Sequence, residues 1–516
     1  MKNVIYINCF ADPWLKVADK MQREYGYKPV YWVGYNEDNS EKKVPENFDG
    51  IVYHKYFDAW KGVFPKQIAD KASEMYIDVD FVRQFASEEL QAIKMMDRLD
   101  FDQRSFNFME RQRHFRNLVR SWMAVIEMYK PDLVVAPVMP HRVYDYVLYL
   151  LCKYVGIPYI MFDHTPFQGR FIVIDNIITI GDMFLDRLHN LELEDSRELE
   201  KRIPKDIFDV VAKVKSDYSV AIPKYMVAHS KKHKTSSNVF GLAKKFLSDN
   251  KTYGASLFGK EGLLRKGVGC YYKNSKLSFE NSKYSILKYA KCKIKANGYK
   301  KKLLAYYESM TLPPESTDKY VIYFMHYQPE ATTCPATNIF VDQQLCIDTL
   351  LNNLPEDYIV YVKEHPSQFF AHEEGQTSRI KEFYNDISKN NRVKLISTKI
   401  NSFSLIEGAK AISTGTGTVG WEAIVRRKPV IIFGFSWYEN YKGVHRVYDS
   451  KSASLIRGFI ESYVYDEHSL LAYLVSFSEN TRKAYYYKGV GKDTMGMSET
   501  DCVDNIIKSL LEKVNG

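Results

Sequence analysis

An apolar strand ends abruptly in polar residues in the stretch Val360-Tyr361-Val362-Lys363-Glu364-His365-Pro366. Lys363 offers a point charge and His365 a directed N–H donor, while Pro366 fixes the turn that aims them. Such a pair would bind a phosphate at the end of the strand. The alternative is a strand-end histidine that bonds its own turn beside a solvated lysine, and the stretch alone favours neither.

The chain that surrounds this stretch alternates between apolar and amphipathic runs. Short apolar runs bounded by turn residues predict strands, and a 3.6-residue period predicts helices between them. The alternation predicts a doubly wound sheet, whose ligands bind beyond the carboxyl ends of the strands. The expected strands are 320–324, 358–362, 393–396, 410–413 and 429–433, and the expected helices are 341–352, 380–387, 402–407 and 419–426.

The first half of the chain shows the same alternation. Because two such sheets lie in one chain, we predict an α/β protein with two Rossmann-like doubly wound domains that face a cleft. Functional residues should then lie just after strands. The expected strands of this half are 1–8, 29–33, 50–53, 131–136 and 157–162, and the expected helical stretches are 14–25, 65–130 and 144–155.

Length and composition agree with a multidomain globular protein. A chain of 516 residues is too long for one core, and 45% hydrophobic with 26% charged residues exclude a disordered chain. No apolar run of about 18 residues could span a membrane and no signal peptide is recognisable, so a cytoplasmic location is expected. The seven scattered cysteines lack a CxxC pair and indicate neither a disulfide framework nor a zinc site.

The positive charge is concentrated in one segment. Net charge is +9, but residues 221–305 hold 20 Lys or Arg against 3 Asp or Glu, so the rest of the chain is net acidic. Lysines interleaved with tyrosines predict either a solvated helical hairpin or docking on an anionic membrane surface. No nucleic-acid-binding motif accompanies them, and no nucleic-acid partner is expected. We predict an N-terminal Rossmann-like domain over 1–220, a basic insertion or linker over 221–305, a C-terminal Rossmann-like domain over 306–490, and a helix over 491–516 that packs back on the N-terminal domain.

A second candidate site follows another strand, in Ser413-Thr414-Gly415-Thr416-Gly417-Thr418-Val419-Gly420-Trp421-Glu422. Hydroxyl groups, glycines and a helix N-terminus together can hold a phosphate without a metal. Glu422, in the first turn of the expected helix, either complements the helix dipole or binds a ribose or sugar hydroxyl. The expected phosphate-binding residues are Ser413, Thr414, Thr416, Gly417 and Thr418.

Three glycines of this stretch also match the GxGxxG pattern of dinucleotide-binding folds, which alone is a weak signal. A dinucleotide site further needs an acidic residue after the next strand, where Gly434-Phe435-Ser436 stands. An NAD-dependent enzyme is therefore the weakest candidate.

Polar residues follow strands at other places too. Gln328 and Glu330 follow the strand 320–324 and could bind a base or a sugar, or form an ordered polar turn. Asp163 and His164 follow the strand 157–162, where the carboxylate could be a nucleophile or base, or an Asx-type turn cap. The loop after the strand 131–136 adds a second basic set at the same edge, His141 and Arg142.

The triplets Asp78-Val79-Asp80 and Asp100-Phe101-Asp102 are similar to the DxD metal-binding pattern of some sugar transferases. Both lie in helical, polar surroundings and not after a strand. We expect them to be solvated helix faces, and we expect no metal and no cofactor.

Together, these motifs resemble the capsular polysaccharide biosynthesis family, which includes the β-Kdo transferases. Asp163-His164-Thr165-Pro166 departs from the family pattern Glu-Asp-Gly-Phe at the first motif. The residues that carry the resemblance are Gly156-Ile157-Pro158 with Asp163 and Arg170, then Gln328, then Lys363 to Pro366, then Thr418-Val419-Gly420-Trp421-Glu422-Ala423 with Lys428-Pro429-Val430 and Gly434.

The resemblance implies a GT-B fold and a metal-independent glycosyltransferase of bacterial capsule assembly, peripheral on the inner face of the cell membrane. Its donor would be a nucleotide sugar, a CMP-activated acidic sugar of Kdo or sialic type, bound by the C-terminal half through His365 and residues 413–418. The N-terminal half would bind a lipid-linked or oligosaccharide acceptor, with His141, Arg142 and Arg170 as secondary contacts. Asp163 would be the nucleophile in a retaining reaction or the base in an inverting one.

Two alternatives remain beside this interpretation. One is a transferase for UDP-sugars or polyol-phosphate polymers on the same fold. The other is a non-catalytic capsule assembly or export partner that keeps the fold and uses the basic segment to hold acidic polymer or lipid.

Overall fold

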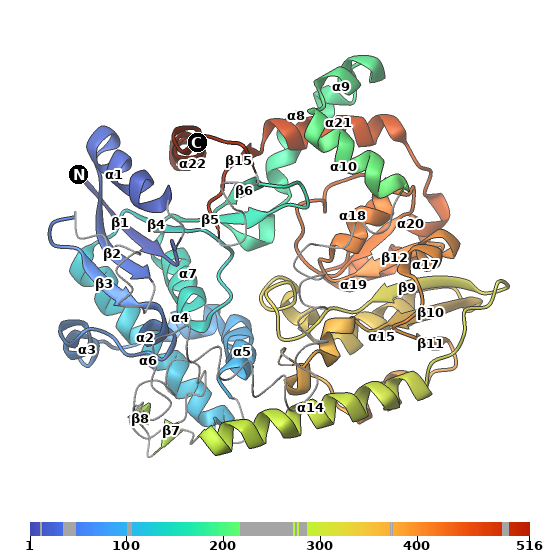
Figure 1. Ribbon diagram of the computed structural model, residues 1–516, viewed down its shortest axis with the longest axis horizontal. Coiled ribbons are helices and arrows are strands. Elements are labelled where there is room, and N and C mark those ends of the chain that lie inside the picture. Colours follow the sequence, from blue (N-terminus) through green and yellow to red (C-terminus); the bar gives the residue numbers. More distant parts are fainter. Residues whose placement is uncertain are drawn as a thin grey trace. The chain divides into compact units, whose positions relative to one another are not determined.

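A computed structural model describes the chain as two compact units (Figure 1). Unit 1 comprises residues 1–96, 107–204 and 472–516, and unit 2 comprises residues 97–106 and 205–471. The described residues are 1–10, 13–34, 48–100, 106–216, 272–273, 276–277, 286–371, 373, 375–487 and 495–515.

Apart from residues 97–106, the chain passes between the units at 204/205 and 471/472, whereas the sequence predicts boundaries at 220 and 490. Helix α10 (Lys205–Ser216) belongs to unit 2, where Arg426 donates a hydrogen bond to the carbonyl oxygen of Val214. Helix α22 (Glu499–Asn515) belongs to unit 1 and packs on α1 (Pro13–Tyr25), with Lys20 donating to Asp504 at 2.7 Å. These contacts join segments that are distant in sequence, which is why composition alone does not mark the boundaries.

Unit 1 is built on a seven-stranded sheet of order β15-β6-β5-β4-β1-β2-β3. Strands β1 to β5 are parallel, and the order β3-β2-β1-β4-β5-β6 is that of a Rossmann fold. Strands β6 and β15 extend the sheet in antiparallel fashion. The strands are β1 (Lys2–Ile7), β2 (Tyr27–Gly34), β3 (Val52–Lys55), β4 (Leu133–Ala136), β5 (Tyr159–His164), β6 (Arg170–Ile174) and β15 (Arg482–Lys483).

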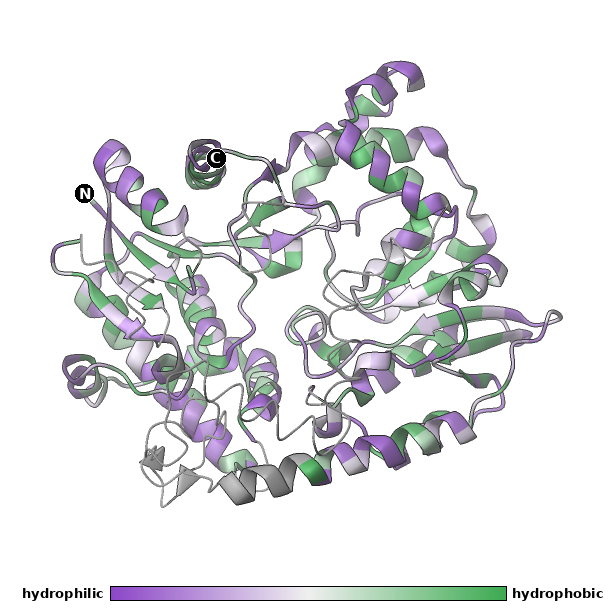
Figure 2. Cartoon of the chain, in the orientation of Figure 1, coloured by the Kyte–Doolittle hydropathy of each residue, from purple (hydrophilic) through white to green (hydrophobic). Residues whose placement is uncertain are grey.

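Helices cover both faces of this sheet. On one face, Trp14 of α1 and Ile506 of α22 are buried in a cluster with Tyr6 and Phe162. On the other face, the ring of Trp122 lies 5.8 Å from that of Tyr31. The strands are accordingly mostly hydrophobic in Figure 2, as expected of a parallel sheet with two covered faces. The remaining helices of unit 1 are α2 (Tyr56–Trp60), α3 (Lys66–Ala72), α4 (Val79–Gln84), α5 (Ala86–Met95), α6 (Phe108–Tyr129), α7 (Val143–Val155), α8 (Leu185–Leu191) and α9 (Ser196–Arg202).

Unit 2 is built on a six-stranded, fully parallel sheet of order β11-β10-β9-β12-β13-β14, again the Rossmann order. The predicted fold class, two Rossmann-like α/β domains, is therefore confirmed. The strands are β9 (Lys319–Phe324), β10 (Tyr358–Lys363), β11 (Val393–Ile396), β12 (Ala411–Thr414), β13 (Val430–Ile432) and β14 (Val444–Arg446), and the helices that follow them are α15 (Gln343–Asn353), α16 (Lys381–Ile387), α17 (Ser402–Gly408), α18 (Thr418–Val425), α19 (Ser450–Ser454), α20 (Ile456–Ser462) and α21 (Glu467–Glu479).

Most of the basic segment 221–305 lies outside the described residues, and so does its predicted membrane contact. Its C-terminal part belongs to helix α14 (Ile286–Ser309), which packs on unit 2. Lys300 is buried there and donates to the carbonyl oxygens of Phe370 and Glu373, each at 2.7 Å. No helix in the described part of the chain is long and apolar enough to cross a membrane.

Two element boundaries differ from the prediction and move candidate residues. Strand β5 continues through His164, because residues 163 and 164 pair with Ile172 and Phe171 of the antiparallel strand β6. Asp163 and His164 are thus the last two residues of a strand and do not follow it. Helix α18 begins at Thr418, which places Glu422 beyond the first turn and rules out a dipole-complementing role for it.

Candidate functional site

The sheet of unit 2 reverses its winding direction between β9 and β12, and polar residues gather at that switch point. Ligands of open α/β sheets bind at the carboxyl ends of the strands beside such a point. Here β9 leads into His326 and β12 leads into the loop 413–418. His365 follows β10, the neighbour of β9, so the two predicted phosphate-binding stretches lie at one edge of one sheet.

His326, which the sequence analysis did not select, connects these stretches. Its Nε2 atom accepts the backbone N–H of Thr416 at 3.0 Å and lies 3.1 Å from Thr414 Oγ1. The side chain of Gln343 in α15 forms two hydrogen bonds with the main chain of His326. It accepts from the N–H at 2.7 Å and donates to the carbonyl oxygen at 3.0 Å. Burial lowers the pKa of His326 to about 3, helped by the nearby His365 and Arg379, so the imidazole stays neutral.

The glycines of the loop allow this close packing. A Cβ atom on Gly415 would lie 2.9 Å from His326 Nε2 and 2.8 Å from Thr337 Cγ2. A Cβ atom on Gly420 would press on the hydroxyl of Tyr438, which donates to the carbonyl oxygen of Gly417 at 2.6 Å. These glycines therefore serve a tight loop, and they do not form a dinucleotide fingerprint, which belongs after the first strand of the sheet, whereas this loop follows the fourth.

His365 is oriented to donate a hydrogen bond from its other ring nitrogen. Its Nδ1 atom accepts the backbone N–H of Ser367 at 3.2 Å, so the ring proton of the neutral imidazole lies on Nε2. Burial, together with the charge of Lys363, lowers the pKa of His365 to about 4. No partner of Nε2 is found among the described residues, and the side chain is only half-buried. The atom can thus donate to a ligand.

Lys363 and Glu422 are buried titratable groups with few hydrogen-bond partners among the described residues. Lys363 donates to Ser402 Oγ at 3.0 Å, and burial lowers its pKa to about 8. Burial raises the pKa of Glu422 to about 8, against the opposing charge of Arg426. The described residues offer the Glu422 carboxyl group no hydrogen bond. A buried, unpaired carboxyl group is costly, which is typical of a group that binds a ligand.

Other residues predicted to bind the nucleotide-sugar donor either form hydrogen bonds within the protein or are buried. Gln328 is buried, its side-chain oxygen accepts from Arg379 at 2.7 Å, and its amide donates to the carbonyl oxygen of Val341 at 2.7 Å. Glu330 accepts from Thr332 Oγ1 at 2.9 Å, and burial raises its pKa. Ser413 and Thr414 are almost fully buried in β12. Of the loop, the residues that are half-buried or exposed are Thr416, Gly417 and Thr418.

Unit 1 presents a similar edge, where its sheet reverses direction between β1 and β4. Asn8, directly after β1, was not selected from the sequence. Its side-chain oxygen accepts from the hydroxyl of Tyr144, and its amide donates to Asp145 at 3.3 Å. A polar residue within two positions of the end of a switch-point strand is the sequence signal that could have found both Asn8 and His326.

Asp163 and His164 lie at the carboxyl end of β5, one strand further along this edge. Burial raises the pKa of Asp163 to about 7. The carboxyl group therefore exchanges protons near neutral pH, as a general base or acid requires. His164 Nδ1 lies 2.7 Å from the hydroxyl of Tyr486, and its ring centroid lies 4.8 Å from that of Tyr487.

The three residues of unit 1 that were predicted as secondary contacts to the acceptor have different environments. His141 Nδ1 lies 2.8 Å from the carbonyl oxygen of Met139. Arg170 is buried in β6 and donates to Thr481 Oγ1 at 3.1 Å, which joins the returning chain to the sheet. Arg142 precedes α7 and stacks on aromatic rings.

The acidic triplets do not form a metal site in the described residues. Asp78 caps α4, accepting from the backbone N–H of Asp80 at 2.8 Å and from the hydroxyl of Tyr154 at 2.6 Å. Asp102 lies outside the described residues. Within the described ranges, no group of three His, Cys, Asp or Glu residues is arranged to hold a metal ion.

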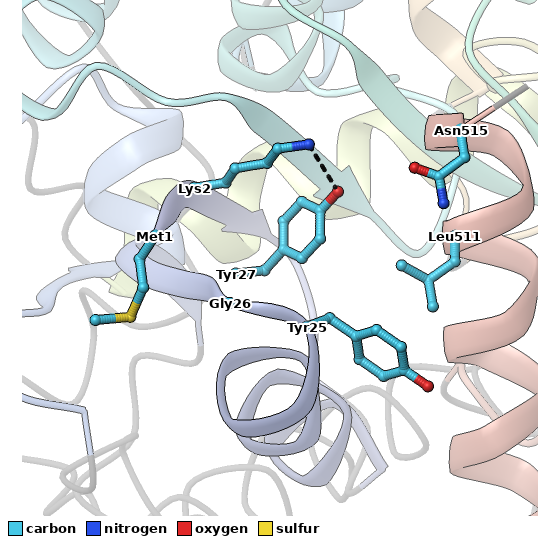
Figure 3. Close-up of a pocket in the computed structure, with 7 residues that line it drawn as sticks. All are labelled: Met1, Lys2, Tyr25, Gly26, Tyr27, Leu511 and Asn515. Carbon is cyan, nitrogen blue, oxygen red and sulfur yellow. Dashed lines mark hydrogen bonds between the residues drawn. The ribbon is translucent and has the colours of Figure 1, made fainter.

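A pocket of about 550 Å³ lies at the opposite edge of the unit 1 sheet (Figure 3). Lys2 donates to the hydroxyl of Tyr27 at 3.4 Å on its wall. It lies beside the amino ends of β1 and β2, away from the carboxyl ends where such sheets bind their ligands. Its lining residues are Met1, Lys2, Tyr25, Gly26, Tyr27, Leu511 and Asn515.

The protein thus consists of two Rossmann-like units, each with polar residues at the carboxyl ends of its strands. A family model described as capsule polysaccharide biosynthesis protein matches residues 332–457, a segment of unit 2 that contains His365, the loop 413–418 and Glu422. The capsule polysaccharide modification protein LipA of Neisseria meningitidis serogroup A is 30% identical over 114 residues, which are 22% of this chain and 15% of LipA. The resemblance to the capsule polysaccharide biosynthesis family is thus confirmed for the matched segment.

Two solved structures are also similar. The β-Kdo 2,4 transferase KpsC of Thermosulfurimonas dismutans is 12% identical, with 73% of this chain and 87% of that chain covered and a TM-score of 0.27. The UDP-GlcNAc 2-epimerase of Methanocaldococcus jannaschii is 12% identical, with 90% and 94% covered and a TM-score of 0.24. Because these scores are low, the fold assignment rests on the order of the strands.

Proposed function

We propose that the protein is a glycosyltransferase of capsule polysaccharide biosynthesis, in which unit 2 binds a nucleotide-sugar donor and unit 1 binds the acceptor. One observation carries the proposal: an unpaired buried carboxyl group, Glu422, shares a sheet edge with the ligand-directed Nε2–H of His365. These groups suit the two ends of a nucleotide. A carboxylate accepts from ribose hydroxyls, and a neutral imidazole donates to a phosphate oxygen.

The chemistry of this edge fits a leaving group that carries phosphate. During transfer, the bond between the anomeric carbon and the phosphate oxygen breaks, and negative charge grows on that oxygen. His365, Lys363 and the N-terminus of α18 would stabilise the charge without a metal ion. Metal independence is part of the proposal, as is the CMP-activated acidic sugar, which follows from the resemblance of the motifs to β-Kdo transferases.

Asp163 is the proposed catalytic group of unit 1. In an inverting reaction, it takes the proton of the acceptor hydroxyl as that oxygen bonds to the anomeric carbon. In a retaining reaction, its carboxylate first bonds to that carbon as the bond to phosphate breaks. The acceptor oxygen then displaces the carboxylate and gives its proton to the phosphate of the departing nucleotide. The pKa of Asp163, about 7, leaves a large fraction ionised at neutral pH, which both routes need. UDP-sugars and polyol-phosphate precursors remain the alternative donors.

Thermal unfolding of the full chain with CMP, UDP, CDP and NAD tests the proposal, since ligands that bind the folded state raise its Tm. We expect CMP to stabilise the wild type and to lose this effect in His365→Ala. A control variant is His445→Ala, in β14 of the same sheet, whose Nε2 pairs with the carbonyl oxygen of Ser452. A preference for UDP or CDP would replace the donor, and no shift with any nucleotide would contradict a nucleotide-sugar transferase.

A further inference from the structure

Arg142 is a half-buried cation whose guanidinium group forms no ion pair with the residues that the structure describes. It stands directly before α7, in the loop that follows β4. Its guanidinium carbon lies 4.7 Å from the ring centroid of Trp60 and 5.5 Å from that of Tyr56. Within the described chain, its guanidinium group forms no hydrogen bond and no ion pair. The five N–H donors of this side chain thus have no acceptor among the described residues.

The nearby carboxyl group of Asp145 forms hydrogen bonds with other groups and not with the guanidinium group of Arg142. Asp145 accepts the backbone N–H of Arg142 at 2.7 Å and the amide of Asn8 at 3.3 Å. It therefore fixes the main chain of Arg142 and the start of α7. Burial raises the pKa of Asp145 to about 7, so at neutral pH it carries only part of a negative charge. The charge of Arg142 opposes this rise, but no hydrogen bond joins the guanidinium group to the Asp145 carboxyl group in the described part of the chain.

Two aromatic rings hold the guanidinium group by cation–π contact. It lies over the rings of Trp60 and Tyr56, and these contacts use none of its N–H donors in hydrogen bonds. That edge matches the two oxygens of a carboxylate or phosphate, and an ammonium group cannot reproduce the fit. A buried cation with this geometry is stabilised when such an anion binds.

The position of Arg142 ties it to the proposed chemistry. It lies at the switch point of unit 1, between β1 and β4, and Asp163 ends the strand next to β4. Tyr487 lies near Arg142 and near the residue after Asp163, because it raises the pKa of Arg142 and its ring centroid lies 4.8 Å from that of His164. An anion on Arg142 would lie beside the proposed catalytic carboxyl group.

We propose that Arg142, Trp60 and Tyr56 form an anion-binding site of unit 1, which takes a carboxylate or phosphate group of the acceptor. This inference rests on the proposed glycosyl transfer. It adds that the acceptor, the second substrate, carries a negative charge. The anion sets the position of the acceptor so that its hydroxyl reaches Asp163. Arg142 is thus a specificity-determining residue.

Calorimetric titration of the full chain tests the site with two matched pairs of probes. The pair p-nitrophenyl glucuronide and p-nitrophenyl glucoside differs in the sugar carboxylate, and the pair glycerol phosphate and glycerol differs in the phosphate. The variants are Arg142→Gln, Arg142→Lys and the control Arg83→Gln, on the exposed side of α4. Unfolding curves show whether each variant folds, and Arg142→Lys keeps the charge if Arg142→Gln does not fold.

We expect the wild type and Arg83→Gln to bind the anionic member of one pair at least tenfold more tightly than its neutral partner. Arg142→Gln should bring that ratio within about twofold, and Arg142→Lys should lose most of it. A preference for glucuronide identifies a sugar carboxylate, and a preference for glycerol phosphate identifies a lipid-type headgroup. The site is refuted if neither pair shows a preference, or if both Arg142 variants retain it.

A nucleotide titration separates this result from the proposed function. Arg142→Gln should keep the CMP-dependent rise in Tm, because Arg142 lies in unit 1 and the donor edge lies in unit 2. If no nucleotide binds but the anion preference disappears with Arg142, the anion site stands and the transferase assignment fails. If nucleotides bind but no anion preference exists, the transferase assignment stands and the anion site fails.

Discussion

His326 Nε2 accepts the backbone N–H of Thr416 at 3.0 Å, so a side chain from the end of β9 holds the loop that follows β12. The two residues lie on opposite sides of the switch point of unit 2. Because Nε2 must be unprotonated to accept this bond, the shape of the loop depends on a neutral imidazole.

Acidification should destabilise the folded chain through His326. Burial lowers its pKa to about 3, whereas histidine in an unfolded chain titrates near pH 6.5. Between these values the unfolded state binds more protons, so the free energy of unfolding falls as the pH falls. From pH 6.5 to 4.5, this histidine should lower the free energy of unfolding by roughly 2–3 kcal/mol. Chemical denaturation at several pH values measures the loss.

His326→Gln is the matched variant, because its side-chain oxygen can accept from Thr416 but does not titrate. The variant should have the wild-type free energy of unfolding at pH 7. On acidification, it should not show the part of the decrease in that free energy that His326 causes. His326→Ala should lose about 1–3 kcal/mol at pH 7, since a buried N–H is left without an acceptor. An unchanged pH slope in His326→Gln would exclude His326 as the source.

Asp163 should control how the rate of transfer depends on pH. Burial raises its pKa to about 7, so kcat/KM should rise with pH through a midpoint near 7 as the carboxylate forms. Asp163→Asn should lower kcat by at least about 10²-fold and remove this midpoint. Steady-state kinetics from pH 5.5 to 8.5 test both points, and a wild-type midpoint that persists in Asp163→Asn would assign it to another group.

Stability gives an independent measure of the same carboxyl group. A raised pKa means that the folded state binds the proton between pH 4 and 7 while the unfolded state releases it. This contribution is full below pH 4 and is lost as the pH rises through 7. Asp163→Asn should therefore gain more stability relative to the wild type at pH 8 than at pH 5, as measured by urea denaturation.

Much of the fold is predictable from local sequence pattern. The strand over 393–396 and the helix over 402–407 match β11 and α17 within one residue, because short apolar runs separated by polar turns define parallel strands well. The extension of β5 was not predicted, since it depends on pairing with β6 across a turn that contains Pro166 and Gly169. The sequence around that turn is typical of a loop.

The site is only partly predictable, because its contacts join distant residues. His365 and the loop 413–418 carry a local signal, namely polar and glycine residues directly after a strand. His326 forms its decisive bond to a residue 90 positions away, and Asn8 bonds to Asp145 137 positions away. Such pairs follow from the strand order, which places the ends of β9 and β12, and of β1 and β4, side by side.

Glu422 should bind nucleotide through its carboxylate. Burial raises its pKa to about 8, so Glu422→Gln removes a group that is largely protonated at neutral pH and should leave the fold intact. Because the amide keeps one acceptor oxygen but cannot ionise, nucleotide affinity should fall by about tenfold at pH 8 and less at pH 6. Titration calorimetry at both values tests this, and equal affinities of variant and wild type would remove Glu422 from the site.

The first turn of α18 should not tolerate a methyl group at Gly420. A Cβ atom there presses on the hydroxyl of Tyr438, whose bond to Gly417 holds the start of α18. Gly420→Ala should lower the free energy of unfolding by about 1–3 kcal/mol and weaken nucleotide binding, since the helix N-terminus shifts. Gly458→Ala, in α20, is the matched control, because nothing lies within 4 Å of its Cβ position and alanine should stabilise the helix by about 0.5–1 kcal/mol. If Gly420→Ala bound nucleotide as tightly as Gly458→Ala, the packing of Tyr438 on Gly420 would not be what positions α18 for a phosphate.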